Sequence, residues 1–299
     1  MKGESMNSSD YLLEKRLREL DPDLHRRLSD NAVVCRYMLK KFKHLFPEYT
    51  DHSLLHSLTV IEACNNIIGE KQIYKLNGDE IFVLLMSCYL HDSGMGISRK
   101  DYDRFKDQMG EKEYFEKHPD DTISDFVRTY HNEFSGLFIT RYAKLFDIPS
   151  EEHLFAIRQV SRGHRKTDLF DETEYPAAYR MPDGNTVCVP YLAALIRLAD
   201  EVDVVASRNP MILYDIEIVK DEFSLLEHRK LDAVKSMEMT ESEFILHAES
   251  DDEKVLEGLR DMVSKMQKTL DLCRKVVEIR TPFSLSQNKV ILVNHSPRE

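Results

Sequence analysis

The sequence predicts a mainly α-helical fold that ends in a small C-terminal α+β domain. Two observations support this prediction. Over residues 1–210 of the 299-residue chain, apolar side chains recur at helical spacing between caps and breakers. After Pro210, short segments alternate apolar and polar residues, as strands do. We therefore expect a helical domain over residues 1–210 and an α+β domain over residues 211–299.

The expected elements follow from periodicity and punctuation. Helices are predicted at 10–20, 23–45, 53–69, 79–92, 122–146, 150–162 and 190–207. The polar segment 98–120 is predicted to form an insertion or lid, and 171–189, with two prolines and an Asp-Gly pair, a loop. In the C-terminal part, strands are predicted at 212–219, 237–248 and 289–294. Apolar spacing from Val255 to Val277 predicts one long helix.

Hydropathy, net charge and cysteine spacing exclude several classes of protein. No apolar run approaches the ~18 residues of a membrane span, and the N-terminus lacks the apolar centre of a signal peptide. We therefore expect a cytoplasmic protein with no membrane partner. The formal net charge of −12 disfavours extended nucleic-acid binding. The five cysteines form no C-x-x-C pair, which argues against a disulfide framework and a thiolate zinc site.

The segment YLHDSGMG, residues 89–96, requires an explanation. An apolar, helix-like run ends there on adjacent His91 and Asp92, which two glycines follow. A buried imidazole beside a buried carboxylate costs desolvation free energy unless a partner neutralises them. A metal ion is one such partner, and a hydrogen-bonded buried polar pair explains His91 and Asp92 equally well.

Further histidines are ambiguous when each is taken alone. His52 and His56 are spaced i, i+4 on one helix face, as a surface pair can also be. His131 lies inside a helical pattern, where a lone, partly buried histidine is common. His164 lies in SRGHR just after an apolar helix, and taken alone it is better explained by a basic helix C-terminus that interacts with the helix dipole.

Two acids lie on the otherwise apolar segment ALIRLADEVD. Asp200 and Asp203 are i, i+3 neighbours there, and Arg197 is available as an ordinary salt-bridge partner. Together with the histidines they complete the order H…HD…H…H…D over successive predicted helices. This order resembles the HD-domain metal-dependent phosphohydrolase superfamily. The matches are His56 in HSLTV, the doublet in YLHDSGMG and Asp200 in LIRLADEVD, within a core of about residues 48–208 of an HD-domain helical bundle.

Branches of this superfamily differ in their extra motifs. His131 and His164 resemble the branches that hold two metals, such as the HD-GYP phosphodiesterases. Met95, however, stands where that family has lysine, and no GYP motif occurs. The stretches LHDSGMG, HNEFS and RGHR are more similar to the HD-CE-like bacterial proteins associated with Hsp90-like ATPase domains.

The resemblance implies one or two divalent ions and a set of ligands. Asp92 would bridge two ions, because a carboxylate can bind two metals whereas an imidazole normally binds one. His56, His91 and Asp200 would complete the first site, and His131 and His164 the second. Mixed nitrogen and oxygen ligands suit Mn, Fe, Co, Ni or Zn better than Mg.

The implied reaction is hydrolysis of a phosphoester or phosphoanhydride bond in a nucleotide, cyclic or linear. Two ions would supply a metal-activated hydroxide as nucleophile and draw charge off the phosphoryl oxygens. His52 matches the proton-donating histidine of the mammalian-type cyclic nucleotide phosphodiesterases, so it is a catalytic candidate beside Asp92. An outer role or metal ligation remains open for His52.

Other side chains are candidates for supporting roles. Arg162, Arg165 and Lys166 can hold substrate phosphates, although a solvated basic turn explains them equally well. Asp203 and Glu133 can orient histidines through hydrogen bonds, and Asp203 can alternatively pair with Arg208.

Two other functions stay open. One is an HD-type nuclease, as in the CRISPR-associated HD proteins, against which the negative net charge counts. The other is a regulatory module that binds a nucleotide or a partner without turnover. No H-E-x-x-H, Walker A, G-x-G-x-x-G or G-x-S-x-G motif occurs, and the sequence leaves homo-oligomerisation open.

Overall fold

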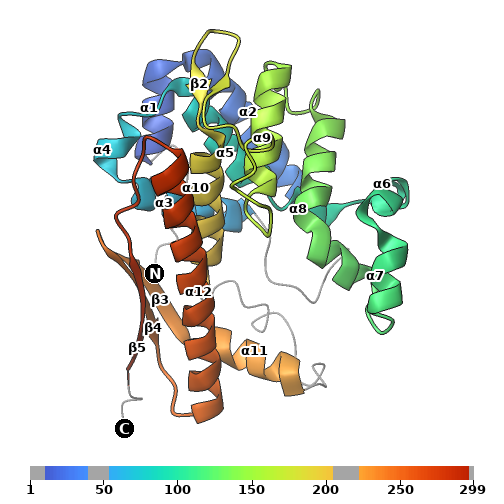
Figure 1. Ribbon diagram of the computed structural model, residues 1–299, viewed down its shortest axis with the longest axis vertical. Coiled ribbons are helices and arrows are strands. Elements are labelled where there is room, and N and C mark those ends of the chain that lie inside the picture. Colours follow the sequence, from blue (N-terminus) through green and yellow to red (C-terminus); the bar gives the residue numbers. More distant parts are fainter. Residues whose placement is uncertain (1–10, 40–53, 205–221, 296–299) are drawn as a thin grey trace.

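Helices dominate the described part of the chain, as predicted, and a small sheet lies in its C-terminal region (Figure 1). The computed structural model describes residues 11–39, 54–204 and 222–295. The helices are α1 (Leu12–Leu20), α2 (Pro22–Leu39), α3 (Leu54–Ile68), α4 (Glu70–Ile73), α5 (Gly78–Leu90), α6 (Arg99–Phe105), α7 (Glu111–Lys117), α8 (Ile123–Tyr142), α9 (Glu151–Arg162), α10 (Val189–Glu201), α11 (Glu222–Ala233) and α12 (Glu253–Arg280). The strands are β1 (Tyr179–Arg180), β2 (Thr186–Val187), β3 (Val234–Met239), β4 (Glu243–Ala248) and β5 (Lys289–Asn294); two 3-10 turns are η3 (Ser93–Gly96) and η4 (Lys106–Met109).

Helix α5 runs through the centre of the helical part. It begins at a reciprocal cap, in which Asn77 accepts from the Glu80 backbone and Glu80 accepts from the Asn77 backbone. Every residue from Ile81 to Leu90 is buried, as expected for a helix that is apolar on all sides. Helices α2, α3 and α9 pack around it. The C-terminal end of α5, where His91 and Asp92 follow, therefore lies inside the protein.

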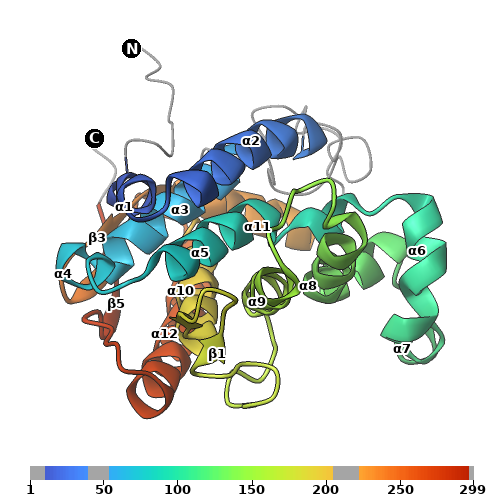
Figure 2. The same ribbon diagram turned by 90° about the horizontal axis from the view of Figure 1, so that it is seen from above.

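Helix α10 crosses beside α5 and joins the two parts of the molecule. It starts at Val189 with Pro190 in its first turn, where the missing N–H has no helical partner to lose. It contacts α3, α9 and the long α12, which lie beside it (Figures 1 and 2). Asp200, one residue before the end of α10, is thereby placed near the start of α3.

The C-terminal sheet has the strand order β3-β4-β5. Strands β3 and β4 form an antiparallel hairpin, and β5 pairs parallel to β4 after the crossover through α12. The inner face carries Phe244 and Leu246, both fully buried. Phe244 shares one hydrophobic cluster with Leu270 of α12 and Leu195 of α10, so the sheet packs on the helical core through α12.

Helices α6 and α7 form an arm at the edge of the molecule, visible in both ribbon views (Figures 1 and 2). The arm has its own aromatic cluster, in which Tyr102 and Tyr114 pack on Phe126 and Phe134 of α8. The polar segment 98–120, predicted as an insertion or lid, thus contains two helices that lean on α8.

Several expected elements differ in detail. The predicted strand 237–248 is a hairpin, because Thr240 caps a turn by accepting from the backbone of Glu243. The predicted helix 122–146 ends at Tyr142, before Asp147 with its positive φ of 43°. The predicted loop 171–189 contains the short β1–β2 hairpin. Segments 40–53 and 205–221, which include the predicted strand 212–219, lie outside the described residues.

Within the described ranges, no single helix is long and apolar enough to cross a membrane. Gly78–Gly96 and Arg99–Met109 meet the length and composition requirement only when joined, and they are bent by 91°.

Candidate metal centre

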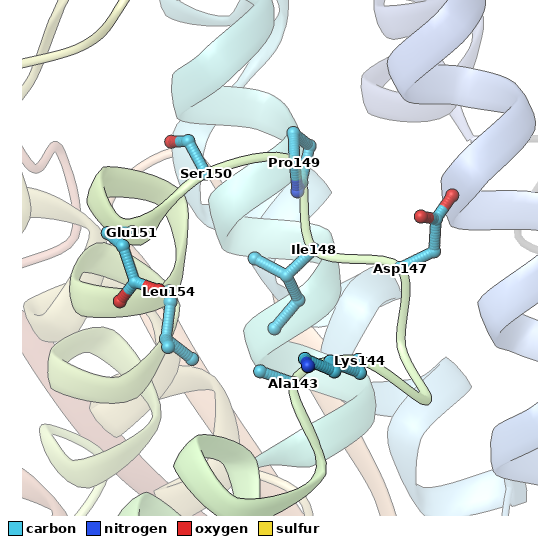
Figure 3. Close-up of a pocket in the computed structure, with 8 residues that line it drawn as sticks. All are labelled: Ala143, Lys144, Asp147, Ile148, Pro149, Ser150, Glu151 and Leu154. Carbon is cyan, nitrogen blue, oxygen red and sulfur yellow. The ribbon is translucent and has the colours of Figure 1, made fainter.

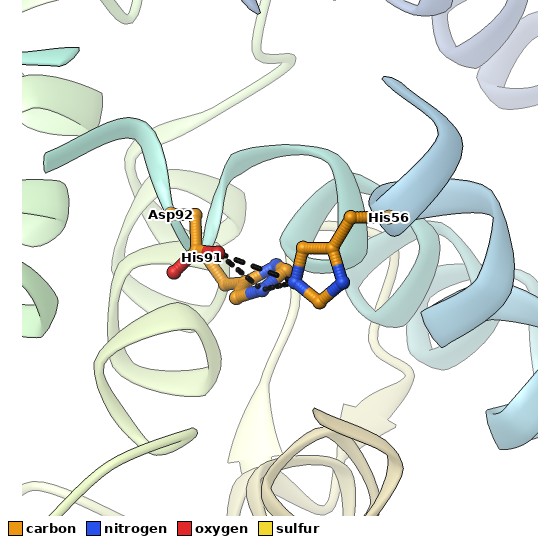
Figure 4. A group of neighbouring side chains, drawn as sticks. All are labelled: His56, His91 and Asp92. Atoms are coloured by element: carbon orange, nitrogen blue, oxygen red, sulfur yellow. Dashed lines mark hydrogen bonds and ion pairs between the residues drawn. The ribbon is translucent and has the colours of Figure 1, made fainter. Parts of the chain in front are cut away.

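One group of ligand atoms gathers where α3 begins and where α5 and α10 end. Nε2 of His56 lies 3.0 Å from Nε2 of His91, 3.2 Å from Oδ2 of Asp92 and 3.3 Å from Oδ1 of Asp200. Nε2 of His91 lies 3.3 Å from Oδ2 of Asp92 and 3.7 Å from Oδ1 of Asp200. Figure 4 shows the His56 ring, from α3, meeting the doublet at the end of α5. The pattern H…HD…D thus converges in space.

A second group shares Asp92 with the first. Nε2 of His131, on α8, lies 2.9 Å from Nε2 of His164, two residues after α9. The same nitrogen atoms lie 3.4 Å and 3.6 Å from Oδ1 of Asp92. Asp92 therefore turns Oδ2 to the first group and Oδ1 to the second, which is the arrangement of a carboxylate that bridges two cations.

These separations fit ligands around metal ions. Ligands at about 2.0–2.2 Å from one ion lie roughly 2.8–3.6 Å from each other in tetrahedral or octahedral geometry. Among the distances within these two groups, only that from Nε2 of His91 to Oδ1 of Asp200 is slightly longer, at 3.7 Å. His56, His91, Asp92, His131 and His164 are all buried. Each group could hold one divalent ion, and their mixture of imidazole and carboxylate suits Mn, Fe, Co, Ni or Zn.

The other ring nitrogen of each histidine contacts an acceptor. Nδ1 of His91, His131 and His164 donates to the carbonyl oxygen three residues earlier, on Cys88, Arg128 and Ser161, at 3.0, 2.6 and 2.6 Å. In the neutral rings Nε2 therefore carries a lone pair. Lone pairs that face each other at 2.9–3.0 Å repel unless a proton or a metal ion lies between them. The donor set itself therefore calls for positive charge.

The electrostatic environment of the two ligand groups also favours positive charge. Burial opposes a charge on His91, but Asp92 and Asp200 more than offset it and raise the pKa of His91 to about 10. Burial, and the positive charge of His91 and His131, hold the pKa of His164 well below its usual value. Burial would raise the pKa of Asp200, yet hydrogen bonds to His56 and His91 keep it well below its ordinary range. The Asp200 carboxylate thus stays ionised and favours a cation beside it.

Asp203 contacts the ring nitrogen of His56 that faces away from the ligand group, as expected of a residue that orients this histidine. Its Oδ2 accepts from Nδ1 of His56 at 2.7 Å and lies 2.7 Å from the hydroxyl of Thr59. A carboxylate on the far nitrogen fixes the tautomer of a ligand histidine and makes it more basic. Arg208, its alternative partner from the sequence, lies outside the described residues, as does His52.

The basic candidates divide into two kinds. Arg162 forms a two-pronged pair with Glu133 at 2.8 and 3.0 Å, and its third nitrogen contacts Gln159 and Glu174. Its guanidinium is thus engaged by protein groups that compete with phosphate, and Glu133 contacts this guanidinium rather than orienting a histidine. Arg165 and Lys166 follow His164 directly and are exposed.

Arg197 holds the segment that carries His164. It does not serve as the ordinary partner of Asp200 that the sequence allowed. Its Nε donates to the carbonyl of Gly163 at 2.7 Å, and Nη2 donates to the carbonyl of Thr167 at 2.9 Å. A side chain on Gly163 would place its Cβ 2.6 Å from Cβ of Ala193. The bare glycine therefore lets the segment lie close against α10.

The turn after α5 rests directly on α8. The backbone N–H of Gly94 donates to the hydroxyl of Ser135 at 2.8 Å, and that hydroxyl donates to the carbonyl of His91. Sequence reasoning assigned no role to Ser135, Thr59 or the three carbonyl acceptors. The spacing from His131 to Ser135, one helical turn, was the available signal for a shared face. Carbonyl acceptors leave no signal in side-chain identity.

A separate pocket lies in the connection between α8 and α9 (Figure 3). It is lined by Ala143, Lys144, Asp147, Ile148, Pro149, Ser150, Glu151 and Leu154. None of the six convergent ligand residues belongs to this lining.

Comparison with known proteins bears on the same region. A family model described as HD-CE matches residues 46–280, more than half of the chain. No curated protein and no solved structure matches the chain significantly. The matched range includes all six convergent ligand residues and extends through α12. The chain therefore belongs to the HD-CE family.

Proposed function

We propose that this protein is a two-metal phosphohydrolase that cleaves a phosphoester or phosphoanhydride bond in a nucleotide. The observation that carries the proposal is the orientation of the Asp92 carboxylate, which points one oxygen toward each group of ligands. A pair of divalent ions bound there would activate water for attack and neutralise charge on the phosphoryl group.

The protein's own side chains would bind the two ions, orient the ligand histidines and limit the access of water. His56, His91 and Asp200 would hold the first ion, and His131 and His164 the second, with Asp92 between them. The burial of the four histidines and Asp92 limits the access of competing water and strengthens their electrostatic interactions. Asp203 would keep Nε2 of His56 directed at the first ion.

The phosphates of the substrate would bind to exposed basic side chains beside the metal centre. Arg165 and Lys166 directly follow His164 and are the available candidates, since Arg162 is paired with Glu133 and Glu174. The proposal keeps His52 as the candidate proton donor to the leaving oxygen.

The test combines metal analysis with a substrate screen. Chelated protein would be reloaded with Mn, Fe, Co, Ni or Zn, and bound metal measured by elemental analysis. Nucleotides, cyclic nucleotides, cyclic dinucleotides and single-stranded DNA would then be offered with Mn. We expect two ions per chain and phosphate or nucleotide release from a nucleotide class.

The matched variant is Asp92→Ala, with Asp261→Asn on the exposed side of α12 as control. We expect Asp92→Ala to lose metal and activity while its far-ultraviolet circular dichroism stays that of the wild type. Wild-type turnover in this variant would refute the proposal. Cleavage of single-stranded DNA alone would favour the nuclease, and metal or nucleotide binding without turnover would favour the regulatory module.

A further inference from the structure

We infer that the hydroxyl of Ser135 is the positioning group that fixes the His91–Asp92 turn on α8 and so holds Asp92 within reach of both metal groups. This inference rests on the proposed two-metal centre and adds a residue to it.

The first observation is a hydrogen-bond bridge in the interior. Helix α5 ends at Leu90, and the N–H of His91 still donates to the carbonyl of Ser87. The carbonyl of His91, by contrast, lies at the helix C-terminus, where no helical N–H follows to bond it. Ser135, which is fully buried, serves two backbone groups at once: it accepts from the N–H of Gly94 and donates to the carbonyl of His91. These groups flank Asp92 on both sides. The side chain of Ser135 on α8 thus fixes the backbone position from which the Asp92 carboxylate extends.

The second observation is independent of the first. A Cβ on Gly94 would collide with the carbonyl oxygen of His131 and would lie 2.6 Å from the backbone nitrogen of Ser135. The turn is therefore seated against the backbone of α8 with no side chain between them. This close contact lets the Ser135 hydroxyl reach both the N–H of Gly94 and the carbonyl of His91. These two hydrogen bonds fix the position of the turn along α8.

The consequence differs between the two ligand groups. Ligand sets work only when held within about 0.5 Å of their productive geometry. Without Asp92, the first group retains His56, His91 and Asp200, whereas the second retains only two of the six ligand residues, His131 and His164. A shift of the turn should therefore weaken the second site more than the first.

The experiment titrates metal-free protein with Mn²⁺ and follows it by calorimetry and electron paramagnetic resonance. Ser135→Ala leaves the N–H of Gly94 and the carbonyl of His91 buried without this partner. We expect affinity for the second ion to fall by about tenfold or more, affinity for the first to change by less than about threefold, and the signal of the coupled ion pair to weaken.

Ser87→Ala is the matched control. Ser87 is a fully buried serine on α5 whose hydroxyl donates a single 3.3 Å bond to the carbonyl of Ile157, away from the turn. It should keep both affinities and the coupled signal. Ser135→Cys, of similar size with a weak S–H donor, should fall between wild type and Ser135→Ala. It also provides the measurement if the alanine variant does not fold.

The outcomes separate this inference from the proposed function. If the wild type binds two ions and neither Ser135 variant differs from Ser87→Ala, the positioning role is wrong and the two-metal centre stands. If the wild type binds fewer than two ions, the two-metal centre is wrong and the inference fails with it. Selective weakening of the second ion supports both.

Discussion

In each histidine of the candidate centre, one ring nitrogen contacts a protein acceptor, and the other faces the ligand group that could hold a cation. In His91, His131 and His164, Nδ1 donates to the carbonyl three residues earlier, which leaves Nε2 directed at Asp92. His56 differs, because its Nδ1 contacts the carboxylate of Asp203. Since a carboxylate makes the ring more basic than a neutral carbonyl does, the first site should bind its ion more tightly than the second.

Asp203 provides a residue-scale prediction. Asp203→Asn keeps the shape of the side chain and removes its charge, so the His56 ring loses its anionic partner. We expect affinity for the first ion to fall about 10–100-fold, as measured by competition with a metal indicator. The same affinity in Asp203→Asn and in the exposed control Asp261→Asn would contradict this role.

Asp79 provides a second residue-scale prediction, away from the centre. Its carboxylate accepts from Nε2 of His153 at 2.9 Å and from Asn185 at 3.0 Å. Burial would raise the pKa of Asp79, but hydrogen bonds from His153 and Asn185 outweigh burial and lower it. A carboxyl whose folded pKa is depressed stabilises the fold above its unfolded pKa, and loses this contribution as the pH falls through the folded pKa.

We therefore expect Asp79→Asn to cost about 1–3 kcal/mol of unfolding free energy at neutral pH. The gap in unfolding free energy between variant and wild type should narrow as the pH falls from about 5 toward the folded pKa of Asp79, which lies below the ordinary aspartate value of 3.8. Urea unfolding at neutral and acid pH measures it, with Asp261→Asn as reference. A gap of constant size across this range would show that ionisation of Asp79 contributes nothing.

At the scale of helices and turns, the centre is built from element ends. His56 lies in the first turn of α3, the doublet follows α5, and Asp200 lies in the last turn of α10. His131 follows Tyr130, whose backbone leaves helical geometry inside α8 (φ −112°, ψ 16°). Ends and breaks allow side chains from different helices to point at a common place, which the middle of a regular helix rarely permits.

The pairing of α8 with α9 yields a prediction that contrasts neighbouring arginines. Arg162 joins α9 to Glu133 of α8 by a two-pronged pair, whereas Arg165 is exposed beside the centre. Arg162→Lys loses the two-pronged geometry. We expect it to lower the midpoint of thermal unfolding with little change in KM for the nucleotide found in the screen.

Arg165→Ala should behave in the opposite way. We expect KM to rise about tenfold, since a contact from a charged donor to phosphate is lost, with the melting midpoint unchanged. Steady-state kinetics and thermal melts on both variants make the comparison. A large KM effect confined to Arg162→Lys would reverse the assignment.

The sequence allowed some of these elements to be predicted and not others. Helical periodicity and the HD order gave the helices around His56, His91 and Asp200, because ligand identity and spacing are carried by side chains. The pairing of Arg162 with Glu133 was missed, since a basic turn looks the same whether it meets phosphate or a carboxylate 29 residues away. The strand predicted at 237–248 was a hairpin, because Thr240 and its turn interrupt a weakly alternating run.

At the scale of the whole molecule, the C-terminal region and the helical part share a core. Leu270 of α12, Phe244 of β4 and Ile61 of α3 belong to one hydrophobic cluster. After α12, Phe283 stacks on Tyr191 of α10 with ring centroids 4.1 Å apart. The HD-CE match likewise continues past residue 210, to residue 280. The parts of the chain before residue 205 and after residue 221 therefore pack against each other.

This shared core predicts cooperative unfolding. Because the sheet and α12 pack on the helical part, neither should melt alone, and calorimetry of the metal-free chain should give one transition whose calorimetric and van't Hoff enthalpies agree. Two resolved transitions would show that residues 211–299 form an independently folded domain.

The central claim is that six side chains from five helices or their ends hold two cations bridged by Asp92. Anomalous diffraction from crystals loaded with Mn²⁺ tests it most directly. We expect two anomalous peaks: one among His56, His91, Asp92 and Asp200, and one among Asp92, His131 and His164. A saturated crystal with no peak at either place, or with peaks only elsewhere on the chain, would contradict it.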